Sequence, residues 1–329
     1  MTKKLLITGG AGYVGTTLIP MLLLKDYEVT VYDLFLYEKN IFKENKNLKC
    51  VNGDIRDIDK LSKVIEGHDY IIHLACISND PSFDLDPKLG REINLNAFEP
   101  MVKVSKELGI KRFINASSSS VYGIQESLDV NEKTEPKPIT DYSKFKLQCE
   151  KILEDYSNDE FVVSSIRPAT VCGYSKRQRL DVVVNILTNF AYFKRKIFIF
   201  GGEQYRPNIY IKDICSSFIE VLEADQKKIF KEVFNVGAKN HTLRELAEIV
   251  KQVVGLDVSI EYQKSDDIRS YHITSDKIKD KLGFVPKYTV EDAVKSLLNA
   301  FEKKLLINTF NDNKFSNIEK MKDINLKWK

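Results

Sequence analysis

Residues 4–15 of the chain read Lys-Leu-Leu-Ile-Thr-Gly-Gly-Ala-Gly-Tyr-Val-Gly, an apolar run followed at once by glycines. Residues 4–8 have the composition of a buried strand, and an apolar pattern with helical spacing follows Gly15. Gly9, Gly12 and Gly15 form a G-x-x-G-x-x-G turn between the two. Without a Cβ, the backbone can bend tightly there and a pyrophosphate can approach the helix N-terminus. The stretch therefore predicts a dinucleotide site at the start of an α/β fold.

A second predicted strand, at residues 28–32, ends directly before Asp33. An acid about 20 residues beyond such a glycine turn accepts hydrogen bonds from the adenosine ribose. After Asp33, the first Lys or Arg in the sequence is Lys39. Because a carboxylate repels a 2′-phosphate, NAD is favoured over NADP. The candidate cofactor-binding residues at this point are Gly9, Gly12, Tyr13, Val14, Gly15 and Asp33.

Length, net charge and cysteine spacing exclude several classes of protein. The 329 residues exceed one typical domain, and 50 Lys+Arg against 47 Asp+Glu give a net charge of +3, so no overall field favours nucleic acid. The apolar runs fall short of the ~18 residues of a membrane span, and the first strand leaves no room for a signal peptide. Five widely spaced cysteines without a C-x-x-C pair indicate neither zinc nor a disulfide framework. We expect a cytoplasmic protein that carries no metal.

Alternation of strand and helix patterns predicts the architecture. Apolar strands that alternate with helices form a parallel sheet covered on both faces, so we expect a Rossmann-type, doubly wound fold. In the first half, the expected strands are 4–8, 28–32, 49–52, 70–74, 112–116 and 161–166, and the expected helices are 14–25, 58–65, 93–108 and 143–157.

The second half is less regular and predicts a smaller C-terminal α/β lobe that closes over the cofactor site. Its expected helices are 181–194, 211–223, 243–254, 276–282 and 290–302, with strands at 197–200 and 258–262. We therefore expect a cofactor domain at 1–172, to which part of 205–240 returns, and a substrate-binding lobe at 173–305. Residues 306–329 are polar and rich in asparagine, with Phe310, Phe315 and Trp328 interspersed. They form either a loosely packed tail or an arm on another subunit.

Two stretches carry candidate chemistry. Tyr142 and Lys146 are four residues apart, which puts both side chains on one face of a helix. A neighbouring ammonium and a positively charged nicotinamide both lower the pKa of a tyrosine, near ~10 in isolation. Tyr142 could then take a proton from a sugar hydroxyl while hydride leaves for NAD. The alternative is an ordinary exposed helix turn.

Serines at positions 117–120 follow the expected strand 112–116. Ligand groups gather at the carboxyl ends of parallel strands, so a serine there can hold the reacting hydroxyl against Tyr142. A polar turn is the alternative, since serines are frequent in turns.

Taken together, these motifs resemble the extended short-chain dehydrogenases/reductases, in the branch of NAD-dependent nucleotide-sugar epimerases and dehydratases. The resemblance spans residues 3–300. It rests on stretches in the family's order, at residues 8–15, 52–57, 73–75, 117–123, 142–146, 166–173 and 206–213.

The resemblance implies roles for individual residues. Asp54 and Ile55 would flank the adenine, and Leu74 and Ala75 would line the cofactor. It further implies three catalytic residues: Ser118 as the catalytic hydroxyl, Tyr142 as the base, and Lys146 as its partner and ribose contact. The candidate substrate-binding residues are Ser119, Arg206 and Arg269, with Arg179 and Arg177 as weaker candidates. Each arginine could instead be a surface residue, although a guanidinium fork suits phosphate.

Departures from the family pattern bear on the reaction. Members that make 4-keto-6-deoxy sugars usually carry Asp-Glu after the catalytic Ser/Thr, where this chain has Ser119 and Ser120. Without that acid and base a 4,6-dehydratase is disfavoured. Cys76, expected near the nicotinamide, is either an acid/base of the kind that 3,5-epimerising members use or a small buried residue.

Three functions remain open. The first is an epimerase that oxidises and re-reduces the sugar at C4 through a 4-keto intermediate. The second is a nucleotide-sugar 4-dehydrogenase that releases the ketone. This hypothesis remains because residues 167–181 resemble those of bacterial relatives in polysaccharide or heptose pathways. The third is a non-catalytic NAD-sensing protein. The resemblance also implies a homodimer, because helices 93–108 and 143–157 carry apolar faces where the family forms its interface.

Overall fold

The computed structural model describes residues 3–125, 127, 129–264, 270 and 272–324. A seven-stranded sheet with the order β10-β6-β5-β4-β1-β2-β3 forms its centre, and every neighbouring pair is parallel. Its strands are β1 (Lys4–Thr8), β2 (Glu28–Asp33), β3 (Leu48–Asn52), β4 (Tyr70–His73), β5 (Arg112–Ala116), β6 (Val162–Pro168) and β10 (Glu232–Val236). The strand order reverses between β1 and β4, which confirms the predicted Rossmann-type sheet and puts a binding crevice at that point.

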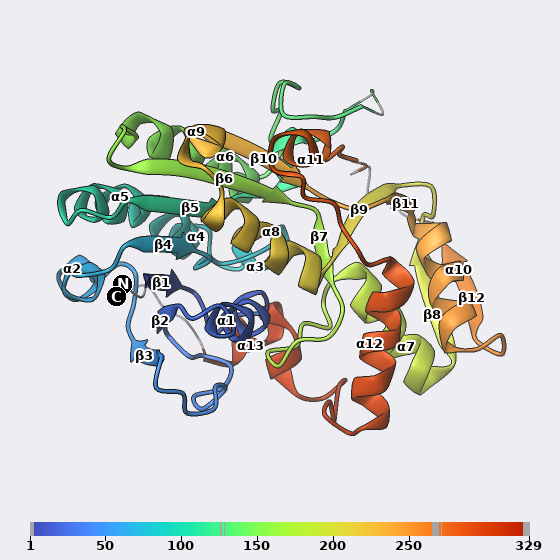
Figure 1. Ribbon diagram of the computed structural model, residues 1–329. Coiled ribbons are helices and arrows are strands. Elements are labelled where there is room, and N and C mark those ends of the chain that lie inside the picture. The colour runs from blue at the N-terminus through green and yellow to red at the C-terminus, as the bar shows by residue number, and fades with distance from the viewer. Residues whose placement is uncertain (1–2, 126, 128, 265–269, 271, 325–329) are drawn as a thin grey trace.

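Helices cover both faces of this sheet (Figure 1). On one face α1 (Gly15–Leu23) packs beside α8 (Ile211–Glu223). On the other face lie α2 (Ile58–Ile65), α5 (Phe98–Glu107) and α6 (Asp141–Tyr156). Each face has its own cluster of buried apolar side chains. The inner strands are thus buried on both sides, as is usual in a parallel sheet, while the edge strand β3 is partly exposed.

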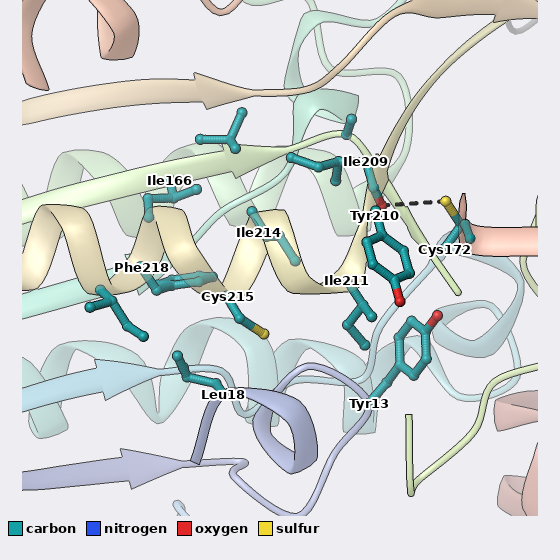
Figure 2. Close-up of a cluster of buried hydrophobic side chains, with 14 of the residues drawn as sticks. Tyr13, Leu18, Ile166, Cys172, Ile209, Tyr210, Ile211, Ile214, Cys215 and Phe218 are labelled. Carbon is teal, nitrogen blue, oxygen red and sulfur yellow. Dashed lines mark hydrogen bonds between the residues drawn. The ribbon is translucent and has the colours of Figure 1, made fainter. Parts of the chain in front are cut away.

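Figure 2 shows part of the core on the α8 face. Ile214, Cys215 and Phe218 reach from α8 toward Leu18 of α1 and Ile166 of β6. All five side chains are at most 1% exposed. This packing fixes α1, and with it the glycine turn that precedes α1, against the sheet.

The smaller lobe holds two short sheets and three longer helices. β8 (Lys196–Phe200) pairs with β12 (Ser259–Gln263), while β9 (Tyr205–Tyr210) lies between β7 (Thr170–Cys172) and β11 (Asn240–Thr242). The helices α7 (Val183–Lys194), α10 (Leu243–Val254) and α12 (Val290–Glu302) pack on one another. Short helical segments complete the fold: α3 (Asp80–Phe83), α4 (Pro87–Arg91), α9 (Gln226–Ile229), α11 (Asp276–Leu282), α13 (Asn317–Ile324), a π-helical turn (Glu92–Asn96) and 3₁₀ turns (Ser119–Tyr122 and Asn313–Phe315).

The structure differs from the expected elements in several places. The expected helix at 93–108 is split into the π-helical turn and α5, because Asn94 turns inward and bonds the backbone of Ile77 through both side-chain atoms, at 2.8 and 2.9 Å. Such π turns occur often at functional sites. Strands β7, β9, β10 and β11 were not predicted, since each is short or mixes polar with apolar residues.

The C-terminal segment also differs from expectation. Residues 306–324 pack on their own chain, so this part of the segment is not a loosely packed tail. Leu306 and Phe315 are each 4% exposed and lie in a cluster with Leu180, Leu297 and Phe301. Each helix within the described residues is too short or too polar to traverse a lipid bilayer.

Candidate functional site

The glycine turn has the geometry of a phosphate cradle. Gly9 has φ +74°, and a Cβ there would lie 2.4 Å from the backbone nitrogen of Ala75. A Cβ at Gly15 would lie 2.2 Å from the carbonyl oxygen of Gly10, so α1 can approach the turn only at a glycine. Gly12 faces the cavity, and its Cβ would meet only the carbonyl oxygen of Gly9, at 3.1 Å. These are the three tasks that glycines perform in a dinucleotide turn.

The N-terminus of α1 points at this cradle. Within the described residues no side chain caps α1 at Val14. The backbone N–H groups of Thr16 and Thr17 already donate to the carbonyls of Gly12 and Val14, each at 3.1 Å, so the helix favours an anion here through the partial positive charge of its N-terminus. At the end of β2, the Asp33 carboxylate accepts hydrogen bonds from the backbone of Ala11 (2.9 Å) and Phe35 (2.8 Å). Burial raises the pKa of Asp33, and these bonds oppose that change. The residues present therefore fit a dinucleotide.

One cavity of about 490 Å³ runs along the carboxyl edge of the sheet. It brings together the candidate cofactor residues and the candidate catalytic residues. Arg206 lies outside it, on β9 of the smaller lobe, and Arg269 lies outside the described residues. The predicted residues that line the cavity are Gly9, Gly12, Tyr13, Val14, Gly15, Asp33, Asp54, Ile55, Leu74, Ala75, Ser118, Ser119, Tyr142, Lys146, Arg177 and Arg179.

Tyr13 and Asp54 make contacts beyond the cavity. The Tyr13 hydroxyl donates to the carbonyl of Gly173 (2.5 Å) and accepts from Asn185 (2.9 Å), which ties the glycine turn to the smaller lobe. The Asp54 carboxylate bonds the Arg56 guanidinium, with the shortest contact at 2.6 Å. Although burial raises the pKa of Asp54, the bonds from Arg56 hold it below its usual value.

Helix α6 places Tyr142 and Lys146. The helix begins at Asp141, two residues before the expected start, because Thr140 caps it in a reciprocal pair with Ser143. Tyr142 is therefore in the first turn and Lys146 one turn later. The Lys146 ammonium donates to the carbonyl of Ala116 at 2.7 Å and lies 5.9 Å from the centre of the Tyr142 ring.

Burial and the charge of Lys146 shift the pKa of Tyr142 in opposite directions. Burial raises the pKa of Tyr142 to about 12, while the Lys146 charge lowers it. The sequence-based expectation of a lowered pKa therefore describes only the lysine's contribution. In the protein alone the phenol keeps its proton at neutral pH, and a second positive charge beside the ring would favour the phenolate.

Ser118 follows β5 and begins the 3₁₀ turn. Its hydroxyl accepts from the backbone N–H of Ser120 at 3.1 Å and lies 2.8 Å from the Ser120 hydroxyl. Ser119 is 2% exposed beneath it. The positions that carry a carboxylate pair in dehydratases thus hold two hydroxyls here.

A buried ion pair supports this turn, and sequence reasoning missed it. Arg167 of β6 bonds Glu150 of α6 at 2.9 and 2.6 Å, and both side chains are about 6% exposed or less. Glu150 also accepts from the Ser117 hydroxyl, and Arg167 donates to the Tyr122 hydroxyl at 2.8 Å. The network joins both ends of the serine turn to the helix that carries Tyr142. The sequence offered one hint of this pair, an acidic residue, Glu150, on an apolar face of the expected helix.

Asp80 was also missed. It lines the cavity at the start of α3, and its carboxylate accepts from the Thr140 hydroxyl at 2.5 Å. Asp80 and Thr140 are 60 residues apart in sequence, so nothing local pointed to the pair. The contact holds α3 against the beginning of α6.

Comparison with known proteins agrees with this geometry. The model of the NAD dependent epimerase/dehydratase family matches residues 5–237. A UDP-glucose 4-epimerase of Lactobacillus helveticus is 27% identical over 88% of this chain and 94% of its own. The structure of the Thermotoga maritima UDP-glucose 4-epimerase with UDP-glucose has a TM-score of 0.84 at 26% identity and covers 92% of this chain and 100% of its own. UDP-glucuronic acid 4-epimerase from Bacillus cereus, solved with UDP-glucuronic acid and NAD, has a TM-score of 0.82 at 25% identity and covers 92% and 99%.

The Glu150–Arg167 pair leads to a stability prediction. Glu150→Gln leaves a buried guanidinium without its counter-charge, so the free energy of unfolding should fall by about 3–5 kcal/mol. Urea titration followed by circular dichroism measures the change. Glu223→Gln is the matched control, because it breaks the exposed Lys25–Glu223 pair at 2.8 Å and should lose at most about 1 kcal/mol. Equal losses in both variants would contradict the structural role.

Proposed function

The chain belongs to the NAD dependent epimerase/dehydratase family, and we propose that it is a nucleotide-sugar epimerase that inverts C4 through a 4-keto intermediate. The family is one of NAD-dependent enzymes, and NAD is the cofactor. The observation that carries the proposal is the shared cavity, in which Ser118, Tyr142 and Lys146 lie on the same edge as the glycine turn. Relatives across most of the chain's length are named as UDP-sugar 4-epimerases, which supports the same reaction.

The glycine turn and Asp33 would hold NAD, which would supply a reversible acceptor for the hydride of the sugar. Tyr142, as phenolate, would take the proton from the C4 hydroxyl during oxidation and give it back during reduction. Lys146 would stabilise the phenolate through its positive charge. The Ser118 hydroxyl would hydrogen-bond the sugar oxygen and hold it toward Tyr142. Proton and hydride are both returned, so a rotated 4-keto sugar would leave as the C4 epimer.

For the substrate's diphosphate we propose Arg179 and Arg206, with Ser119 near the sugar. Arg179 bonds Asp181 at 2.9 Å and Ser78 at 3.3 Å, and its Nη2 has no partner among the described residues. A guanidinium nitrogen that lines the cavity without a partner suits a phosphate oxygen. Arg206 reaches the site only if the substrate extends to β9, and a contact from Arg269 stays a prediction.

We further propose a homodimer through α5 and α6. A surface groove between these helices is lined by charged and apolar side chains, among them Glu99, Lys103, Lys151 and Ile152. Opposite charges next to apolar groups suit a self-complementary, twofold interface.

Proton NMR tests the reaction. Purified protein with NAD is incubated with UDP-, GDP-, dTDP- and CDP-sugars, and we expect a new anomeric signal while the sugar's mass is unchanged. A hydrated-ketone signal with accumulating NADH would instead establish the 4-dehydrogenase. A 6-deoxy methyl signal would overturn the argument from Ser119 and Ser120. A protein without turnover on any sugar would favour an NAD-sensing role.

Tyr142→Phe separates chemistry from cofactor binding. Loss of a positioned acid/base should lower turnover about 10²–10⁴-fold, while NAD affinity, measured by calorimetry, should stay within about threefold because the cradle is intact. Turnover close to wild type would contradict the role of Tyr142. An equal loss of NAD affinity would show that the residue acts mainly in binding.

Lys146→Met tests the electrostatics of the pair. The Lys146 charge lowers the pKa of Tyr142, so its removal should raise that pKa further. Because the base acts when deprotonated, the variant should lose activity at neutral pH, and the alkaline rise of kcat/KM should move to higher pH. A profile measured with saturating NAD checks this. An unshifted profile with only a lower plateau would contradict the mechanism.

A further inference from the structure

The C-terminal segment reaches the same cavity, although its sequence indicated either a loosely packed tail or an arm on another subunit. After α12 the chain returns from the smaller lobe to the central sheet, where α13 lies near α3 (Figure 1). Asn317 and Met321 of α13 line the cavity. We propose that Asn317 is a cofactor-positioning residue that holds the Arg177 guanidinium toward the NAD pyrophosphate, so that cofactor retention depends on docking of the C-terminal segment.

Docking of this segment is specific. The Leu180 backbone N–H donates to the carbonyl of Phe315 at 2.8 Å, and the Asn317 backbone N–H donates to the Asp181 carboxylate at 2.8 Å. The Phe315 side chain is buried beside Leu180. The segment is therefore attached to the loop at residues 173–181, which carries Arg177.

That loop is in turn seated on the glycine turn. The Ser175 hydroxyl lies 2.7 Å from the Thr16 hydroxyl and donates to the carbonyl of Tyr13 at 2.9 Å. The Arg177 backbone N–H donates to Thr16 at 3.3 Å. Thr16 is in the first turn of α1, and a pyrophosphate binds at the N-terminus of such a helix. The backbone of Arg177 is therefore held beside that N-terminus.

Asn317 orients the Arg177 side chain. The Asn317 carbonyl oxygen accepts from Arg177 Nη2 and, at 3.0 Å, from the Tyr37 hydroxyl, while its Nδ2 donates to the Ser78 hydroxyl at 2.8 Å. The guanidinium carbon lies 3.5 Å from the centre of the Tyr37 ring. Stacking on Tyr37 and the bond to Asn317 together fix the plane of the guanidinium.

The remaining Arg177 nitrogens lack partners. Arg177 is 4% exposed, and its Nε and Nη1 have no hydrogen-bond partner within the described part of the chain. The nearby Asp181 carboxylate is already paired with Arg179 at 2.9 Å. A buried charge with unsatisfied N–H groups is costly unless an anion completes it. A pyrophosphate in the same cavity would supply that anion and suits the planar fork.

This position also bears on the choice of cofactor. The absence of a cation close to Asp33 in the sequence favoured NAD, yet the fold brings Arg177 within electrostatic reach of Asp33. A contact to a 2′-phosphate would make the protein accept NADP, whereas a contact to the pyrophosphate serves NAD. Because Asp33 lines the cavity where the adenosine ribose is expected, we assign Arg177 to the pyrophosphate.

Binding of nucleotides to the full-length chain, stripped of bound nucleotide, tests the proposal without any sugar reaction. By calorimetry Asn317→Ala should bind NAD about 10-fold more weakly, and Arg177→Met about 10- to 100-fold, as expected for a charge-assisted hydrogen bond. ADP, which keeps the pyrophosphate, should lose as much affinity for Arg177→Met as NAD does, and adenosine should lose none. The double variant should bind no more weakly than Arg177→Met, because Asn317 acts through Arg177. Wild type should prefer NAD to NADP.

Asn311→Ala is the matched control, since Asn311 is an exposed asparagine of the same segment, and it should bind NAD as wild type does. Thermal melting without nucleotide separates a purely structural effect: a lower Tm of Asn317→Ala with unchanged NAD affinity would overturn the proposal. Three further results would also overturn it: additive losses of NAD affinity in the double variant, equal losses of affinity for adenosine and ADP in Arg177→Met, or tight binding of NADP by the wild type.

Hydrogen exchange of the wild type needs no variant. NAD should slow amide exchange in residues 317–324, because a pyrophosphate that completes Arg177 also stabilises its contact to Asn317. Unchanged exchange there, with slowed exchange at the glycine turn, would overturn the coupling while leaving the proposed epimerase activity untouched.

Discussion

The close approach of two backbones at one edge of the sheet is the constraint on which the site depends. The glycine turn after β1 lies against the residues that follow β4, where a Cβ on Gly9 would collide with Ala75 at 2.4 Å. This contact puts the end of α1 and the ends of β4 and β5 along one cavity. Because strand ends of a parallel sheet share an edge, a cofactor in the turn and a hydroxyl at Ser118 lie on the same path.

Buried polar pairs keep that edge in place. Glu150 and Arg167 join α6 to β6 behind the serine turn, and Asn94 satisfies both backbone groups of Ile77. In each pair, hydrogen bonds within the protein replace hydrogen bonds to water, because a buried polar group without a partner would destabilise the fold. The candidate catalytic side chains therefore lie on elements whose positions are fixed by hydrogen bonds as well as by apolar packing.

The cofactor end is built differently, from three segments far apart in sequence. The glycine turn holds the 173–181 loop through Thr16 and Ser175, and that loop holds the C-terminal segment through Asp181 and Asn317. Arg179 is balanced by Asp181, while Arg177 keeps two unpartnered nitrogens among the described residues. Arg177 thus places a positive charge in the cavity, at the position where we propose that the cofactor's pyrophosphate binds.

Three features could be predicted from local properties of the chain: the Rossmann-type sheet from strand composition, the glycine turn from its missing Cβ atoms, and the Tyr142–Lys146 pair from helical spacing. The sequence also indicated the serine turn, from its place after a strand. The contact of Arg177 with Asn317, 140 positions away, and the pairing of Glu150 with Arg167 become visible when the chain is folded. Such contacts depend on how loops and helices dock. The sequence shows which residues are charged or polar, but it does not show which buried partner each of them will bond. For the same reason the asparagine-rich C-terminal segment was predicted to be a loose tail or an arm on another subunit, although its few apolar residues anchor it beside the cavity.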